Sequence, residues 1–136
     1  MRLILSTTPI LAATLCLALA TPVAAKPPLR EVSAIDDSLM MVAIADEIRK
    51  TCDDIRARMV RAMTTINGLK FTAEDLGYTD DEIDAYVTSK AEKKRMRKKA
   101  TAWLASKGVA AENSSQLCKF GKAEIARETE IGRLLR

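Results

Sequence analysis

The sequence has no histidine, and it is poor in cysteine, aromatic residues, glycine and proline. Its 136 residues include three cysteines, five glycines and four prolines, and aromatic side chains make up 4%. Without histidine the chain cannot form a Ser-His-Asp or Cys-His catalytic group or an imidazole metal site, and three cysteines are too few for a zinc site made of cysteine alone. The scarcity of aromatic residues, glycine and proline argues against an all-β sandwich. We therefore expect a single domain without a metal or cofactor, and we favour a protein that is not an enzyme.

The first 25 residues have the pattern of a secretory signal peptide. Arg2 supplies a positive charge, the segment from Leu3 to Ala20 is largely apolar, and the small residues up to Ala25 suit a signal peptidase. We predict cleavage between Ala25 and Lys26, and hence a periplasmic or secreted protein. The alternative is an uncleaved membrane anchor, but the uninterrupted apolar run of about 11 residues is shorter than the roughly 20 that span a bilayer.

The predicted mature chain, residues 26–136, keeps two of the three cysteines. Removing 25 of the 136 residues leaves 111, and the loss of Arg2 leaves 21 basic against 18 acidic side chains, a net charge of +3. In an oxidising compartment Cys52 and Cys118 most simply form a disulfide. Closing this long loop would stabilise the fold by about 4 kcal/mol. A redox-active pair is the alternative, although the chain has no Cys-x-x-Cys motif.

Helical periodicity dominates the first half of the mature chain. Residues 26–32 contain two prolines and predict an extended leader. Ser33 is a candidate N-cap for a first helix that runs to about Thr51. Asp53 is a candidate N-cap for a second helix, in which apolar residues alternate in steps of four and three until Gly77 ends it. This stripe, the longest in the chain, consists of Ile55, Met59, Ala62, Ile66, Leu69, Ala73 and Leu76.

Two capping boxes divide the middle of the chain into shorter helices. In each box a hydroxyl accepts a hydrogen bond from a helix N–H, and a glutamate reaches back to the N–H of the N-cap residue. The pairs are Thr79 with Glu82 and Ser89 with Glu92. They predict a third helix from Thr79 and a fourth from Ser89.

The remaining signals complete an all-α prediction. Gly108 suits the end of the fourth helix, Asn113 is a candidate cap for the last helix, and Thr129 is a candidate break within it. No useful length of the chain alternates as a β-strand does. We predict one all-α domain over residues 33–136, a compact bundle of about five helices closed by the disulfide.

Positive charge is concentrated in the predicted fourth helix. The segment from Ser89 to Lys107 has eight basic residues and one acidic, a net charge of +7, which leaves −4 on the rest of the mature chain. We predict that this surface binds an acidic protein or an anionic membrane surface; the alternative is a solvated face that serves solubility. Nucleic acid is not an expected partner of an exported protein, and no small-molecule substrate is indicated. The candidate partner-binding residues are Lys90, Lys93, Lys94, Arg95, Arg97, Lys98 and Lys99.

Two other features allow more than one interpretation. The acidic residues cluster near predicted helix starts, where they complement the helix dipole; a small hydrolase that uses a pair of carboxylates is the alternative. Gly121 and Gly132 lie within a helical pattern and predict close packing against the first two helices. The alternative for this C-terminal region is a partner contact through Arg127 and Arg133.

Five segments give the mature chain a resemblance to a known family. They are Ala45-Asp-Glu-Ile-Arg-Lys-Thr-Cys52, Ile55-x-Ala-Arg-Met59, Leu76-Gly-Tyr-x-Asp80, Gly121-Lys-Ala-Glu-Ile-Ala126 and Ile131-Gly-Arg-Leu-Leu135. They resemble a family of small exported proteobacterial proteins of unknown function, DUF5333. The resemblance implies an exported helical domain with a cysteine pair, and it supplies no activity, ligand or catalytic residue. The family's loose association with genes of a respiratory NADH dehydrogenase makes an accessory factor of that enzyme one alternative.

A second and narrower resemblance rests on Thr51-Cys-Asp-Asp54. This segment is similar to the first cysteine region of the small periplasmic acid-stress chaperones, which are helical, of similar size and closed by one long-range disulfide. It implies a chaperone as another alternative, whose pH switch would have to come from carboxylates because no histidine titrates. The leading hypothesis is a non-enzymatic periplasmic binding or accessory module with a basic docking helix.

Overall fold

The computed structural model describes residues 25–136, and in this part of the chain the backbone is mostly helical. Its elements are η1 (Leu29–Glu31), a 3-10 helix, and the α-helices α1 (Ser33–Thr51), α2 (Met59–Asp75), α3 (Asp80–Thr88), α4 (Lys90–Ser106), α5 (Ser114–Ala126) and α6 (Glu130–Arg133). Residues 25–136 form no strand beyond an isolated bridge between Ala57 and Leu135. The prediction of an all-α domain is confirmed. The predicted signal segment lies almost entirely outside the described residues, so its cleavage stays a prediction.

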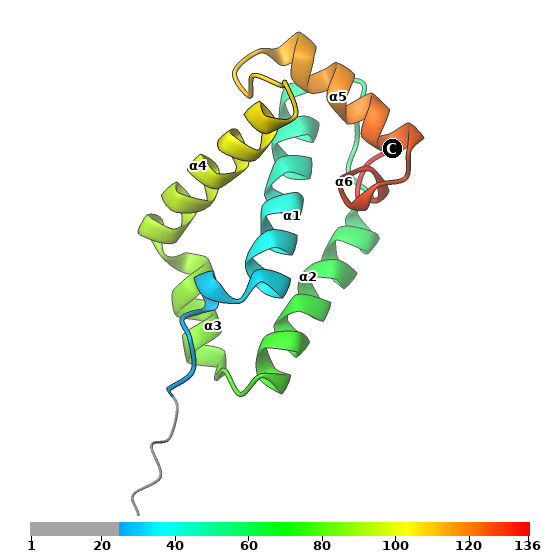
Figure 1. Cartoon of the computed structure of the whole chain (residues 1–136). Coiled ribbons are helices and arrows are strands. Elements are labelled where there is room, and N and C mark those ends of the chain that lie inside the picture. The colour runs from blue at the N-terminus through cyan, green and yellow to red at the C-terminus, as the bar shows by residue number, and fades with distance from the viewer. Residues whose placement is uncertain (1–24) are drawn as a thin grey trace, which may run out of the picture.

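Helix α1 lies in the middle of the molecule (Figure 1). Helix α4 lies on one side of α1 and α2 on the other, α5 crosses one end, and α3 lies at the opposite end. The main core forms where α1 meets α4, α5 and α6, and its central side chains are at most 2% exposed. They include Ile44, Ile48, Leu104, Leu117 and Ile131.

A second, smaller core cluster holds the leader at the α3 end of the molecule. Leu29 of η1 is buried there beside apolar residues of α1, α2 and α3. The Tyr78 hydroxyl donates to the carbonyl oxygen of Pro27 at 2.5 Å, and the Lys26 ammonium donates to that of Gly77 at 2.5 Å. The leader is therefore packed against the domain and contains one 3-10 turn, whereas its prolines predict a fully extended segment.

The second helix begins later than the sequence predicts. α2 starts at Met59, and Asp53 caps no helix. Residues 53–58 instead run beside the C-terminal segment, where the Arg56 N–H donates to the Arg136 carbonyl oxygen at 2.7 Å and the Arg136 N–H donates to the Arg56 carbonyl oxygen at 2.8 Å. These long-range bonds satisfy the backbone without a helical turn, which is why a local cap signal is overridden.

The two predicted capping boxes differ in the structure. Thr79 and Glu82 form the complete box at the start of α3. Ser89 makes half of its box, since its hydroxyl accepts from the Glu92 N–H at 3.2 Å. The Glu92 carboxylate does not return to the N-cap, because it pairs with arginine side chains, among them Arg95 at 2.7 Å.

The other helix ends follow the sequence closely, with one exception. Asn113 caps α5, and Thr129 caps α6 and so separates it from α5. Gly77 and Gly108 adopt positive φ at the ends of α2 and α4, as a C-terminal glycine does. The exception is Ser33, which is the first residue of α1 and makes no cap hydrogen bond.

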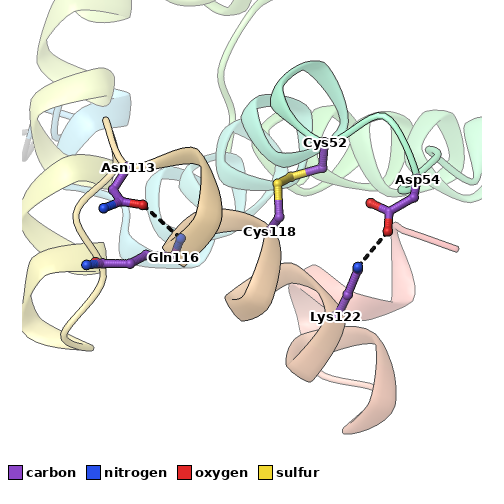
Figure 2. The surroundings of a disulfide bond; sticks show 6 residues. All are labelled: Cys52, Asp54, Asn113, Gln116, Cys118 and Lys122. Atoms are coloured by element: carbon purple, nitrogen blue, oxygen red, sulfur yellow. Dashed lines mark hydrogen bonds and ion pairs between the residues drawn. A yellow bond between two sulfur atoms is a disulfide. The ribbon is translucent and has the colours of Figure 1, made fainter.

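The predicted disulfide is present and joins the end of α1 to the start of α5 (Figure 2). Cys52 directly follows α1, Cys118 lies in the second turn of α5, and their Cα atoms are 5.6 Å apart. Gly121 lies one turn further along α5, where an added Cβ would come within 2.7 Å of the Ile48 side chain. The prediction of close packing against the first helix is therefore confirmed for Gly121.

Gly132 is also closely packed, but against a different neighbour. An added Cβ at this position would lie 1.9 Å from the carbonyl oxygen of Glu124, which belongs to α5. The nearest neighbour of Gly132 is thus α5, while α6 as a whole also packs against α1, as the sequence predicts for this region. The tight turn at Thr129 folds α6 back onto α5, and only a glycine leaves room for that backbone.

Candidate functional site

Helix α4 turns two basic residues, Arg95 and Lys99, toward a buried aspartate of α1. The side chain of Asp36 is 2% exposed. It accepts hydrogen bonds from Arg95, Lys99 and Tyr86. The Lys99 ammonium lies 2.6 Å from Asp36 Oδ2, and Glu92 supports the guanidinium of Arg95. A buried carboxylate with several charged donors is fully satisfied, so we assign this cluster a structural role.

The neighbours of Asp36 determine its pKa. Burial alone raises the pKa of this carboxyl, but the hydrogen bonds from Arg95, Lys99 and Tyr86 outweigh burial and lower the pKa to about 2. The hydrogen bond to Asp36 raises the pKa of Arg95 above its usual range. Burial, followed by the hydrogen bond to Asp36, raises the pKa of Tyr86. Asp36 is therefore ionised and paired at any pH well above 2.

Only part of the predicted partner-binding set faces solvent. Arg95 and Lys99 point toward α1 and pair with Asp36, so the structure does not bring them to the exposed side. The other five residues are exposed and form no ion pair within the described part of the chain. At about 100° per residue they occupy one side of α4, opposite the aspartate cluster. These five, which we call the basic face, are Lys90, Lys93, Lys94, Arg97 and Lys98.

Helix α2 exposes the apolar residues that its sequence pattern assigns to a core. Ala73 is the one residue of α2 that is buried. Within the predicted stripe Met59 is 59% exposed and Ile66 38%, and outside it Met63 is 50% exposed and Phe71 63%. The helical period is correct, but α2 packs mainly on α1 and α3, and none of the other helices within residues 25–136 covers its outer side. One signal was available in the sequence: Met63 and Phe71 lie outside the main stripe, so apolar residues surround much of the helix.

An apolar groove of about 300 Å³ lies between α1 and α2. Helix α2 and the C-terminal segment line it with apolar side chains, and α1 forms its opposite wall. Asp46 and Arg49 are its charged residues, and they pair with each other at 2.6 Å. The apolar side chains that line what we call the apolar groove include Leu39, Val42, Met59, Met63, Ile66, Leu134 and Leu135.

Two other hollows adjoin the apolar groove, one near Leu39 and one near Met59. Leu39 also lines a cleft of about 150 Å³ that includes Glu92, which is paired with Arg30 and Arg95, and Lys93 of the basic face, which is unpaired among the described residues. Met59 also lines a hollow of about 550 Å³ that contains three arginines and no acidic side chain. We call these arginines, Arg58, Arg61 and Arg136, the arginine rim. Positive charge therefore lies beyond both ends of the apolar groove.

Several other carboxylates are engaged by basic partners. Asp54 pairs with Lys122 at 2.5 Å beside the disulfide (Figure 2), and Asp80 pairs with Lys70 at 2.8 Å. These contacts lower the pKa of both aspartates. Residues 25–136 contain no group of three or more cysteine or carboxylate side chains placed to hold a metal ion. Nor is any helix in this part of the chain both long and apolar enough to cross a bilayer.

The C-terminal arginines contact their own chain. Arg127 pairs with the buried Glu124, whose carboxylate also accepts from the Thr129 hydroxyl at 2.5 Å. The Arg133 side chain donates to the carbonyl oxygen of Glu128 at 2.8 Å. These contacts hold the turn between α5 and α6, which favours the packing interpretation of this region over a partner contact.

These features define a small helical domain that is closed by a disulfide. The chain belongs to a family of unknown function, DUF5333, whose profile matches residues 27–136. The family resemblance found in the sequence is thereby confirmed. Neither a curated protein nor a solved structure gives a significant match.

Proposed function

We propose that this protein is a non-enzymatic binding or accessory module that docks through its basic face onto an acidic surface of a partner protein. The observation that carries the proposal is the division of charge on α4. Its inward charges are paired with Asp36 and Glu92, whereas the five outward ones have no carboxylate partner among the described residues. Unpaired charge of one sign on a rigid helix attracts a surface of opposite sign and orients it.

A protein partner is favoured over a membrane because of how α4 is oriented. Helices that lie in a membrane interface combine a basic side with an exposed apolar side. The apolar residues of α4 face the bundle, since Leu104 is 2% exposed and Met96 and Trp103 pack against the main core. The basic face is therefore available for electrostatic contact, but α4 has no apolar side free to enter lipid.

Export to the periplasm is part of the proposal. The disulfide supports it, because such bonds persist in oxidising compartments. The signal-like pattern of residues 1–25 supports it as well. An accessory role with a respiratory NADH dehydrogenase, which the family resemblance implies, is one form that such a module could take.

The test compares charge reversal on α4 with an equal change of net charge on α5. The partner is first captured by crosslinking in cells and identified by mass spectrometry, and the purified pair is then titrated. We expect Lys94→Glu/Lys98→Glu on α4 to weaken binding at least tenfold and to reduce its salt dependence. Lys119→Glu/Lys122→Glu on α5 changes the net charge equally and should bind as the wild type does. Equal binding by both variants, or binding of anionic vesicles in place of a protein, would overturn the proposal.

A chaperone is a second candidate because α2 exposes large apolar side chains. Such residues are what a client-binding protein presents to unfolded chains. Acid activation is the weaker part of this candidate, since Asp36 keeps its ion pairs until the pH approaches 2. Light scattering of an aggregating client at pH 7 and pH 3 tests it, and a chain that leaves aggregation unchanged at both pH values removes it.

A further inference from the structure

We propose that the apolar groove binds an amphipathic, acidic helix of the partner protein. This inference rests on the proposed function and deepens it, because it names a second contact and the form of the bound segment. The basic face attracts and orients the partner, whereas the apolar groove holds one of its helices.

The walls of the groove are apolar side chains that the fold leaves in contact with water. Met59, Met63 and Ile66 of α2 are 59%, 50% and 38% exposed. On the opposite wall, Leu39 and Val42 of α1 are only partly buried. A pair of helices with an open apolar seam between them is the arrangement in which proteins bind the apolar face of a third helix. The two methionines add side chains that adjust to different ligand shapes.

The length of the groove matches a short helix. Its lining on α1 extends from Leu39 to Arg49, which at 1.5 Å per residue is about 15 Å. A bound helix of about three turns covers this distance. Such a helix presents apolar residues at positions i, i+3, i+4 and i+7 to the groove.

Charge around the groove selects an acidic helix. The arginine rim lies beyond the end at Met59, and Lys93 of the basic face lies beyond the end at Leu39. Within the groove, Asp46 and Arg49 neutralise each other. A helix with an apolar stripe and acidic residues toward both ends therefore meets positive charge at each end, whereas a basic helix is repelled.

The decisive experiment uses two designed peptides as probes. Each is an 18-residue helix with leucine at i, i+3, i+4 and i+7, and it carries glutamate at both ends in one version and lysine in the other. Binding to the purified chain is measured by fluorescence anisotropy. We expect the acidic peptide to bind at least tenfold more tightly than the basic one. Equal affinity, or no binding of the acidic peptide, would overturn the inference.

Two substitutions on the same helix locate the binding site. Met63→Asp places a carboxylate in the groove and should weaken binding of the acidic peptide at least tenfold. Phe71→Asp alters another exposed apolar residue of α2 that does not line the groove, and it should leave binding unchanged. Circular dichroism checks that both variants keep the wild-type helix content. Equal effects of the two substitutions would overturn the inference.

The same variants distinguish this inference from the proposed function. If Met63→Asp binds the crosslinked partner normally while Lys94→Glu/Lys98→Glu does not, the groove inference fails and the basic face stands. If instead Lys94→Glu/Lys98→Glu binds normally and Met63→Asp does not, docking through the basic face is rejected and the groove inference is kept. The remaining alternative is that a second copy of this chain fills the groove, and analytical ultracentrifugation tests it. A wild-type dimer that Met63→Asp converts to a monomer would support that alternative and overturn the inference.

Discussion

Helices α2 and α4 both have 17 residues and both flank α1, yet they are held to it in opposite ways. α4 is the more polar helix, and its inward charges meet Asp36 in a cluster in which each group has partners. α2 has the longest apolar stripe in the chain, and most of its large apolar side chains remain in water. Apolar character therefore does not decide which helix is buried in this fold. Both helices pack mainly on α1 and α3, and they differ in which side chains are left outward: charged ones on α4 and apolar ones on α2.

Removing the disulfide should have the largest effect on stability. The double variant Cys52→Ser/Cys118→Ser frees a loop of 66 residues, and we expect the free energy of unfolding to fall by about 4 kcal/mol. Urea denaturation followed by circular dichroism measures the change. Wild-type protein with a reductant should show a similar loss. A loss below about 1 kcal/mol would mean that packing alone fixes α1 against α5.

Asp36→Asn should remove the ion pairs that hold α4 against α1. The substitution removes the charge that Arg95 and Lys99 share, and we expect a loss of about 3 kcal/mol in the free energy of unfolding. Asp37→Asn is the matched control, since the Asp37 side chain is 54% exposed and its pair with Lys99 should contribute less than about 1 kcal/mol. Equal losses in the two variants would show that burial of Asp36 is unimportant.

The same carboxylate predicts a stability change in acid. The folded pKa of Asp36 is lowered from 3.8 to about 2, so its contribution is complete above pH 4 and is lost as the pH falls through 2. This difference corresponds to roughly 2 kcal/mol at neutral pH. Thermal unfolding between pH 5 and pH 1.5 should show the loss in the wild type. The Asp36→Asn variant should lack that component, and parallel curves would contradict the assignment.

Changes on the exposed side of α2 should have the smallest effect on stability. We expect Met63→Ser and Phe71→Ser to alter the free energy of unfolding by about 0.5 kcal/mol or less, because half or more of each side chain is already in water. On α4, Leu104→Ala should cost about 3 kcal/mol, since Leu104 is 2% exposed. Urea denaturation of the three variants compares the two helices directly. A large fall in the free energy of unfolding for Met63→Ser would mean that this wall of the apolar groove is part of the folded core.

Features governed by local geometry could be predicted from the sequence. The Thr79 capping box, the glycine at 108 and the cap at Asn113 each depend on a few neighbouring residues, and all are present. The disulfide followed from a count of two cysteines in a chain expected to be exported. Asp53 failed as a helix start because its segment pairs with the distant C-terminus, and no local pattern contains that information.

The candidate site was predicted only in part, for the same reason. The charge of α4 can be read from the sequence, but the assignment of Arg95 and Lys99 to a buried aspartate on α1 depends on how the helices are placed. The apolar groove was missed because a stripe such as that containing Ile66 is the same whether a partner helix belongs to the chain or to another molecule. Periodicity shows which side of a helix avoids water, and the fold decides what covers it.

The disulfide has a consequence for how the protein withstands proteases. Both the basic face and the α2 wall of the apolar groove lie within the 66-residue loop that Cys52 and Cys118 close. A protease that cuts once in this loop, for instance at an exposed lysine of α4, therefore leaves the two pieces covalently joined. Such a nicked molecule runs as one band on a gel without reductant and as two bands with it. Damage to a binding surface and dissociation of the chain are thus separate events in this fold.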